Sequence, residues 1–301
     1  FPLFMRKRQF PDVCFITSQY NLSEWDFRHF VWPRYQLKSL MYRDLRLWLL
    51  RMPLQRMIFH WADHVIVQAP ELVDRLIQIP GVPRRKLSWI PNSISGKLEP
   101  CRSQTRTTDR PHPEVRLLVA GGFGISKGAD DLLNLLVLAG KQGLPLKATV
   151  LGGMAAIDEV YLKQRVHKLG VASLVQFLPR VDALRMPEYY ATHDWLFHLS
   201  HVEGSPRVVL EALAHHLSVI GSRHPGIRVL DPQNQFILYA DHGKMEILLN
   251  TLMQMEQQPE LRLERASKGA EYVHREFSSQ AISRRYVDLY LRLLNQSPTS
   301  P

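Results

Sequence analysis

Two glutamates with the chemistry to bind hydroxyl groups, Glu203 and Glu211, stand eight positions apart. Glu203 follows residues 194–199, an apolar run that predicts a strand, and Glu211 lies within 206–215, which predicts a helix. Ligands bind beyond the carboxyl ends of parallel strands, so a loop acid and a helix acid at such an end can face one ligand. Because ionised carboxylates are strong hydrogen-bond acceptors, the pair could hold the hydroxyls of a sugar or a ribose.

The residues between the two glutamates predict how the helix begins. Gly204 and Ser205 are typical of a loop and a helix cap, and Pro206 fits the first helical turn. The plainer alternative makes Glu203 a surface loop acid and Glu211 an exposed helix residue. We favour a binding site, because the apolar neighbours of Glu211 predict its partial burial, and a partly buried carboxylate needs a partner.

A glycine-rich loop, 121–128, follows the predicted strand 115–120 and leads into the predicted helix 128–142. Glycines allow close backbone approach, the helix N-terminus presents N–H groups suited to phosphate, and Lys127 adds a full positive charge. The alternative is a plain turn that carries a solvated lysine, and glycine motifs alone are weak signals.

A second pair of glycines, Gly152 and Gly153, follows the predicted strand 146–151. By itself this pair favours nothing more than a tight turn. Its position at the carboxyl end of a predicted parallel strand is what makes it a candidate ligand contact.

The rest of the chain supplies the elements that would hold these loops. Short apolar runs predict strands, and longer periodic segments between them predict helices. The expected strands are 12–17, 64–68, 87–90, 115–120, 146–151, 174–178, 194–199, 217–220 and 236–238. The expected helices are most of 27–62, then 70–77, 128–142, 157–169, 186–192, 206–215, 243–256, 259–275 and 279–294. This alternation predicts an α/β fold with a parallel sheet covered on both faces.

Composition excludes several classes of protein. The chain has 301 residues, of which 45% are hydrophobic, too many for a disordered chain. Two cysteines, Cys14 and Cys101, are too few for a disulfide framework and match no zinc pattern. No run of 18 apolar residues could cross a bilayer as a helix. Because the first residue is Phe and the opening stretch is unlike a signal peptide, we expect a fragment of a longer protein.

Most of the net charge of +10 lies near the N-terminus. Residues 28–62 hold seven basic residues and one acid, interleaved with Trp and Leu at helical spacing. Such a segment suits an interfacial helix on an anionic membrane surface. Helices packed on a first sheet, with their arginines in solvent, fit equally well. Nucleic acid is disfavoured as a partner, because the aromatic residues fit an apolar face and no binding motif is present.

The stretch 200–222 resembles the signature of the family 4 retaining glycosyltransferases, which have the GT-B fold. The family pattern is a glutamate, seven residues and a second glutamate, with Gly and Pro between them, and Glu203 and Glu211 match it. Further landmarks follow in the family's order, at 65–70, 81–92, 127–128, 152–153, 175–179 and 189–194. Each landmark is modest alone, but the ordered set is strongly specific.

The resemblance implies a role for each matching residue. Glu211 would hold the donor's ribose hydroxyls, Glu203 would contact the donor sugar, and Lys127 would neutralise the diphosphate leaving group. The backbone of Gly204, Ser205, Pro206 and Arg207 would lie near the diphosphate, and Arg180 and Val181 would border the nucleobase. The other residues expected around the donor are Gly122, Ser126, Gly152 and Gly153. The donor would be a UDP- or GDP-linked sugar, with no cofactor and no metal, because the lysine and a helix dipole supply the positive charge.

Two features depart from the family pattern. The arginine expected five positions before Lys127 is Gly122, so either Ser126 and the glycine N–H groups compensate or activity is weaker. Family members also carry a glycine-rich loop ahead of the equivalent of Asp12, and the histidine often found on the strand that matches 13–17 is lacking. Acceptor-side catalytic residues are therefore left unassigned.

We expect a GT-B fold of two Rossmann-like domains, the N-terminal one incomplete. Residues 1–95 would form the acceptor-side domain, 96–113 a linker, 114–275 the nucleotide-sugar-binding domain, and 276–301 a helix crossing back to the first domain and a disordered tail. The expected function is transfer of a sugar, with retention, to a glycan or lipid-linked acceptor in cell-surface polysaccharide or glycolipid synthesis. The expected location is the cytoplasm, with peripheral binding to the cytosolic membrane face. The alternatives are a nucleotide-sugar epimerase of the same fold and a non-catalytic nucleotide-sugar-binding partner subunit.

Overall fold

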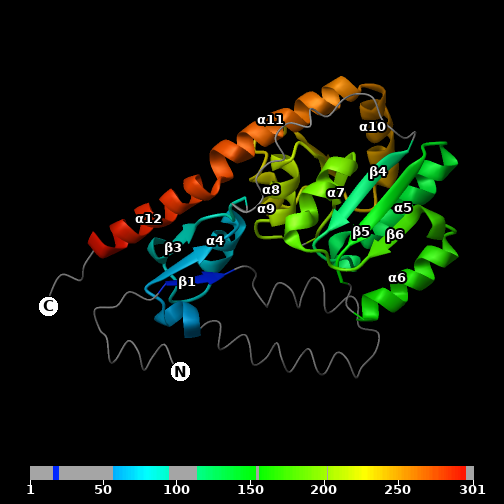
Figure 1. The fold of residues 1–301 in the computed structure, drawn as a ribbon. Helices are drawn as coiled ribbons and strands as arrows, with labels where there is room; N and C mark the ends of the chain where they lie inside the picture. Colours follow the sequence, from blue (N-terminus) through cyan, green and yellow to red (C-terminus); the bar gives the residue numbers. More distant parts are fainter. Residues whose placement is uncertain (1–15, 20–56, 95–113, 154–155, 202, 296–301) are drawn as a thin grey trace. The chain divides into compact units, whose positions relative to one another are not determined.

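The computed structural model describes residues 16–19, 57–94, 114–153, 156–201 and 203–295. These residues form helices, short 3-10 turns and two separate parallel sheets (Figure 1). The predicted linker 96–113 lies outside the described residues, as does most of the basic segment 28–62. The chain divides into two compact units, one of residues 1–92 with 282–301 and one of residues 93–281.

The first unit contains a three-stranded parallel sheet in the order β1-β2-β3. Its strands are β1 (Ile16–Gln19), β2 (His64–Val67) and β3 (Leu87–Trp89), and its shorter helices are α4 (Pro70–Leu76) and the 3-10 turn η2 (Arg84–Lys86). Phe59, Val65 and Leu76 are fully buried in one apolar cluster. The last helix, α12 (Ser279–Asn295), reaches this sheet, where Arg292 Nη2 donates to Ser88 Oγ of β3 at 3.4 Å.

The second unit contains a six-stranded sheet, parallel throughout, in the order β6-β5-β4-β7-β8-β9. Its strands are β4 (Val115–Ala120), β5 (Leu146–Leu151), β6 (Val175–Leu178), β7 (Trp195–His198), β8 (Ser218–Ser222) and β9 (Ile237–Ala240). The chain builds outward from β4 through β5 to β6, then returns to the other side of β4 and builds outward from β7 to β9. The central pair β4 and β7 is therefore the switch point of the sheet, where ligands bind in open α/β folds.

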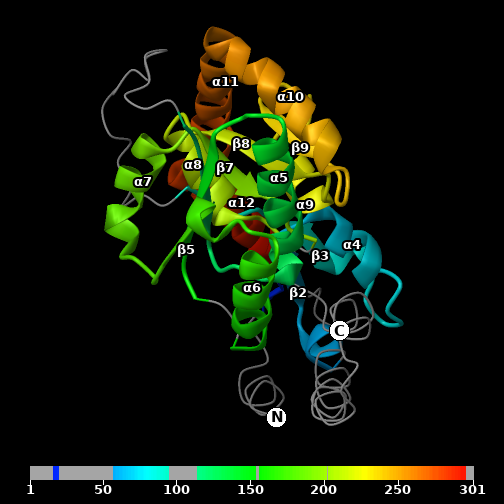
Figure 2. The same cartoon turned by 90° about the vertical axis from the view of Figure 1, so that its right-hand side faces the viewer.

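Helices cover both faces of this sheet. They are α5 (Ala129–Lys141), α6 (Ala156–Lys168), α7 (Met186–Thr192), α8 (Arg207–Ala214), α9 (Pro225–Arg228), α10 (Met245–Gln257) and α11 (Pro259–Phe277). Figure 2 shows α7 and α8 on one side of the strands and α5 on the other. On one face α5 packs against α10, and on the other α8 packs against α11. The covering explains why β7 and β8 are buried along their whole length, because neither face meets water.

Sequence patterns predicted this second unit closely. The bounds of β4, β5 and α7 are the predicted ones, and the other elements differ from prediction by no more than two residues at an end. Four short elements were not predicted: α9 and the 3-10 turns η3 (Ile125–Lys127), η4 (Ala172–Leu174) and η5 (Ala183–Arg185). Single turns of three or four residues carry no apolar period, so no pattern in the sequence marks them.

Gly128 joins the glycine-rich loop to α5 and allows a very close approach to the end of β7. Its φ is +80°, and a Cβ at this position would lie 2.4 Å from the carbonyl oxygen of Leu199 and 2.8 Å from its Cβ. Only glycine adopts this conformation without strain and leaves room for the Leu199 backbone. The start of α5 and the loop after β7 are thus fixed to one another.

Substitution of Gly128 by alanine should lower the free energy of unfolding by about 2 kcal/mol or more, because left-handed strain and a backbone clash add together. Gly143→Ala is the matched control, since Gly143 has a φ of +76° but no atom of the described residues lies within 4 Å of the added Cβ. The control should lose only about 1 kcal/mol. Urea denaturation measures both variants, and equal losses would contradict the packing role of Gly128.

Candidate functional site

The loops that carry the candidate residues meet at the switch point of the six-stranded sheet. Residues 121–128 follow β4, and residues 199–206 follow β7, its immediate neighbour. Between them, the backbone N–H of His201 donates to the carbonyl oxygen of Ser126 at 2.9 Å, and Ser200 Oγ donates to the same oxygen at 3.4 Å. Two segments far apart in sequence therefore form one platform at the carboxyl edge of the sheet.

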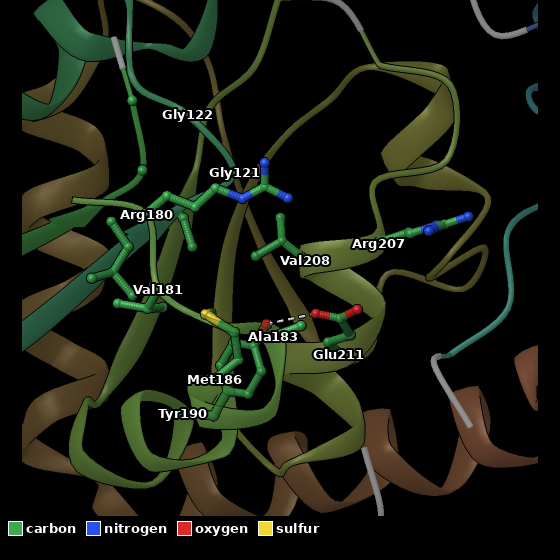
Figure 3. Close-up of a pocket in the computed structure, with 14 residues that line it drawn as sticks. Gly121, Gly122, Arg180, Val181, Ala183, Met186, Tyr190, Arg207, Val208 and Glu211 are labelled. Carbon is green, nitrogen blue, oxygen red and sulfur yellow. Dashed lines mark hydrogen bonds between the residues drawn. The ribbon is translucent and has the colours of Figure 1, made fainter. Parts of the chain in front are cut away.

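A cavity of about 500 Å³ opens beside this platform (Figure 3). Its lining combines two glycine turns, apolar side chains, two arginines and one carboxylate. The lining residues are Ala120, Gly121, Gly122, Leu151, Gly152, Gly153, Arg180, Val181, Ala183, Met186, Tyr190, Arg207, Val208 and Glu211. Its volume falls within the range of small-molecule sites, about 300–1,000 Å³, and apolar walls with few polar groups are typical of them.

The floor of the cavity is backbone rather than side chain, because two glycine turns lie against each other. Gly122 has a φ of +91°, and Gly152 has a φ of +112°. A Cβ on Gly152 would lie 3.1 Å from the backbone nitrogen of Gly122, so a side chain here would push the two turns apart. A ligand can therefore reach the main chain of both turns directly.

Glu211 faces the cavity from α8 and is held by a tyrosine of α7. The hydroxyl of Tyr190 donates to Oε2 of Glu211 at 2.9 Å, and the Tyr190 side chain is fully buried (Figure 3). Burial raises the pKa of the Glu211 carboxyl, and the Tyr190 hydrogen bond and the Arg207 charge offset only part of that rise. The sequence predicted partial burial and a partner for this carboxylate, and both predictions are confirmed.

The N-terminus of α8 differs from the prediction in one detail. The N-cap is Pro206, with an extended backbone, rather than Ser205, and no side chain makes a capping hydrogen bond. Proline suits this place because it has no N–H to satisfy and its φ is already fixed. Arg207 is the first helical residue, and its guanidinium points away from the cavity, whereas Arg180 extends over it (Figure 3).

Lys127 and Glu203, one from each loop of the platform, meet His198 at the end of β7. Lys127 Nζ forms an ion pair with Glu203 Oε1, and His198 Nε2 lies 3.1 Å from the same oxygen. The Glu203 side chain is only 12% exposed, so it is not the surface loop acid of the alternative interpretation. Burial alone would raise the pKa of Glu203, but the hydrogen bonds and charges of His198 and Lys127 outweigh it and lower the pKa to about 2.

The loop that carries Glu203 is fixed from a third direction by the residues after β8. Ser222 Oγ donates to the carbonyl oxygen of Ser200 at 2.7 Å. A Cβ on Gly226, in α9, would lie 2.4 Å from the carbonyl oxygen of Gly204 and 2.5 Å from that of Glu203. The backbone around Glu203 is therefore tightly packed, which keeps the carboxylate in one position.

The model of the family described as glycosyl transferases group 1 matches residues 103–272, more than half of the chain. The chain belongs to the glycosyl transferases group 1 family. The matched range contains Lys127, Glu203, Glu211 and the whole lining of the cavity. The family that the ordered set of sequence landmarks resembles is confirmed.

The chain matches part of the length of one curated relative. Mannosylfructose-phosphate synthase of Agrobacterium fabrum (strain C58) is 26% identical over 206 residues, which cover 65% of this chain and 45% of that protein. The chain therefore matches a little less than half the length of that relative.

Two solved structures share the fold of this group 1 chain. Sucrose-phosphate synthase from Thermosynechococcus elongatus superposes with a TM-score of 0.74 and 19% identity, over 98% of this chain and 71% of that one. Anabaena Alr3699/HepE, in complex with UDP-glucose, superposes with a TM-score of 0.72 and 16% identity, over 93% of this chain and 72% of that one. At such identities the likeness concerns the fold, and the predicted α/β GT-B fold is confirmed.

The predicted donor residues of this group 1 chain fall into two places. Seven line the cavity: Gly122, Gly152, Gly153, Arg180, Val181, Arg207 and Glu211. The other six lie on the platform outside its lining: Ser126, Lys127, Glu203, Gly204, Ser205 and Pro206.

Among the helices that the structure describes, none combines the length and apolar character needed to cross a membrane.

Sequence reasoning did not single out Tyr190 or His198 as site residues. Tyr190 stood within a family landmark but carried no sign that its hydroxyl would meet Glu211, 21 positions away. A signal for His198 was present, since it is a polar residue inside the apolar run 194–199, at the end that leads to the Glu203 loop. A buried polar residue at that end needs a partner, and Glu203 is the first acid after it in the loop that follows.

The lowered pKa of Glu203 makes stability depend on pH in a defined window. A carboxyl with a folded pKa of about 2 and an ordinary value of 4.5 contributes its full stabilisation above pH 4.5 and loses it as the pH falls toward 2. Glu203→Gln should therefore lower the free energy of unfolding by about 3 kcal/mol at pH 7. The difference in free energy of unfolding between this variant and the unsubstituted chain should shrink as the pH falls from 4.5 to 2.

Urea denaturation at several pH values measures this gap. Glu271→Gln is the control, because Glu271 is an exposed glutamate of α11. Its free energy of unfolding should stay close to that of the unsubstituted chain at every pH. A loss in Glu203→Gln that stays constant across the window would show that the ion pair does not hold this carboxyl in its charged form.

Proposed function

We propose that this chain is a retaining glycosyltransferase that moves a sugar from a nucleotide-sugar donor to a glycan or lipid-linked acceptor. Family membership supports the reaction class. The observation that carries the proposal is the placement of Glu211, a half-buried carboxylate oriented by Tyr190, in a cavity floored by two glycine turns. The Lys127–Glu203 pair in the adjoining loops then supplies charge where a diphosphate and a sugar would lie.

The cavity suits the nucleoside half of a donor. Glu211 can accept hydrogen bonds from two neighbouring ribose hydroxyls, because each carboxylate oxygen has lone pairs to spare. Tyr190 uses one lone pair on Oε2 and so fixes the plane of the carboxylate before the donor arrives. Apolar side chains from Val181, Met186 and Val208 can cover the flat faces of the base and the ribose.

The glycine turns and the cations suit the diphosphate. Gly122 and Gly153 expose backbone to the cavity, and the N-terminus of α8 adds the positive end of a helix dipole. Arg180 is the guanidinium directed at the cavity (Figure 3), and Lys127 lies at the far end of the same loop as Gly122. Positive charge here stabilises the diphosphate as the bond to the sugar breaks.

Glu203 acts as a hydrogen-bond acceptor for the donor sugar and not as a proton donor. With a pKa of about 2 it is ionised at neutral pH and has no proton to give. Its position beside Lys127 also gives the lysine a partner before the donor binds. Binding would let Lys127 interact with phosphate while Glu203 turns its free lone pairs to sugar hydroxyls.

UDP-glucose is the first donor to test, because Anabaena HepE, which shares the fold, was solved with it. A panel of UDP- and GDP-linked sugars completes the search, since the cavity residues do not fix the base. Donor hydrolysis or epimerisation without any acceptor would favour the epimerase alternative over transfer.

Glu211→Gln should weaken donor binding by about 10- to 100-fold, because a charged acceptor for two hydroxyls becomes a neutral amide. Lys127→Met should lower turnover by about 100- to 1,000-fold with a smaller effect on donor affinity, because it removes charge that matters most as the bond breaks. Calorimetry measures binding, and product release from a UDP- or GDP-sugar measures turnover.

The same Glu271→Gln variant serves as the control for this experiment, and it should bind and turn over donor as the unsubstituted chain does. Tyr190→Phe should show an intermediate loss of donor affinity, because Glu211 remains but is no longer oriented. Donor affinity and turnover that are unchanged in both Glu211→Gln and Lys127→Met would refute the proposed site.

Gly122 favours a second candidate, a nucleotide-sugar-binding partner subunit without turnover of its own. The residue that would add a guanidinium beside Lys127 is here a glycine with a φ of +91°. Donor binding that depends on Glu211, with no transfer to any member of an acceptor panel, would support this candidate. Transfer to any acceptor would exclude it.

We place the acceptor reaction in cell-surface polysaccharide or glycolipid synthesis at the cytosolic membrane face, on the basis of the basic segment 28–62. Sedimentation with vesicles tests this placement. The chain should bind vesicles with 30% anionic lipid and release at high salt, because the attraction is electrostatic. Replacing Arg43, Arg46, Arg51 and Arg56 by Gln should abolish binding, and binding to neutral vesicles alone would contradict it.

A further inference from the structure

A carboxylate and two imidazoles meet on the platform, outside the donor cavity. Asp131, His201 and His242 can each offer one ligand atom, and these atoms lie within 4.8 Å of one another. Among the residues that the structure describes, this is the one group of three or more His, Cys, Asp and Glu that is so placed. None of the three lines the donor cavity.

Three different elements bring these residues together at the carboxyl edge of the sheet. Asp131 lies in the first turn of α5, His201 in the loop between β7 and α8, and His242 in the loop between β9 and α10. They are therefore 70 and 41 positions apart in sequence. Such convergence from distant segments is not produced by a local turn or a charge run.

Asp131 is a fixed carboxylate that orients one of the histidines. It is only 7% exposed, and Oδ1 accepts from the backbone N–H of Gly243 at 2.8 Å. Oδ2 lies 2.7 Å from Nδ1 of His242. A carboxylate oxygen and an imidazole nitrogen held this close can become neighbouring ligands of one ion once the proton between them is lost.

We propose that Asp131, His201 and His242 bind a divalent transition-metal ion of the zinc class. Zinc takes imidazole nitrogen and carboxylate oxygen at about 2.0–2.2 Å, and three protein ligands with a water in the fourth place form a common site. Ligand atoms on one tetrahedral ion lie roughly 3.3 Å apart. Both histidine side chains are only partly buried, so each ring has room to turn toward one ion.

The rings of His201 and His242 are stacked, with centroids 3.5 Å apart and an angle of 11° between their planes. A metal ion lies in the plane of each imidazole that binds it, so two parallel stacked rings cannot both aim a nitrogen at one ion. One ring must therefore turn when the ion binds. The nitrogen that becomes a ligand must also be free of its proton, which leaves to solvent.

A bound ion would tie the Glu203 loop to α5 and to the start of α10. His201 is two residues before Glu203, and its backbone N–H already donates to Ser126, next to Lys127. The ion would thus brace the loop that carries the charged pair without touching the donor. This role does not depend on the proposed glycosyltransferase reaction.

Calorimetric titration of the whole chain with Zn²⁺ tests the proposal, on protein prepared without a polyhistidine tag. One equivalent should bind saturably. His201→Ala and His242→Ala should each weaken binding by about 10-fold or more, because each removes a ligand. His167→Ala, an exposed histidine of α6, is the matched control and should bind as the unsubstituted chain does.

Two further readouts do not involve activity. Co²⁺ in place of Zn²⁺ should give visible absorption bands that His242→Ala removes, and saturating Zn²⁺ should raise the melting temperature of the unsubstituted chain but not that of His201→Ala. Absence of one saturable equivalent in the unsubstituted chain would overturn the proposal. A histidine variant that binds Zn²⁺ as tightly as the unsubstituted chain would also overturn the proposal.

Discussion

The loop after β4 and the loop after β7 are in backbone contact, and the candidate site is built on that contact. Gly128 lets the α5 N-terminus approach Leu199, while Ser126 accepts from the backbone of His201. Lys127 lies between Ser126 and Gly128 in the first loop, and Glu203 lies two residues after His201 in the second. The ion pair is therefore positioned by main-chain packing and not by the reach of flexible side chains.

That constraint explains how a buried carboxylate can remain charged. Removing an ion from water is costly unless partners replace the lost hydration. Glu203 receives a cation from one loop and an imidazole from the end of β7. Among the described residues, Glu211 receives a hydrogen bond from the neutral hydroxyl of Tyr190 and the charge of a more distant arginine, and burial raises its pKa. The two glutamates share a sequence motif, but their surroundings shift the two pKa values in opposite directions.

The sequence predicted the features that depend on the type of residue at each position along the chain. Strands of a sheet covered on both faces are mostly apolar, so the short apolar runs of β4 and β5 gave their true bounds. Glu203, Glu211 and Lys127 were proposed as donor residues because they match the family's ordered motifs. The sequence did not mark Tyr190 or the Asp131–His201–His242 cluster, because their contacts join residues that are far apart along the chain. It did not mark His198 either, because the neighbours of a strand end are known only from the folded structure. The prediction of Ser205 as the cap of α8 was wrong for a local reason, since Pro206 itself occupies that position.

The left-handed backbone of Gly122 has a consequence for how the cavity could change over evolutionary time. An arginine introduced there would have to leave a φ of +91°, and the backbone nitrogen of Gly122 would move with it. Gly152 packs against that nitrogen closely enough that its own turn would have to shift as well. The two glycine turns are therefore coupled positions: the effect of a side chain at one depends on the residue at the other, and an arginine at 122 would require a compensating change across the cavity floor.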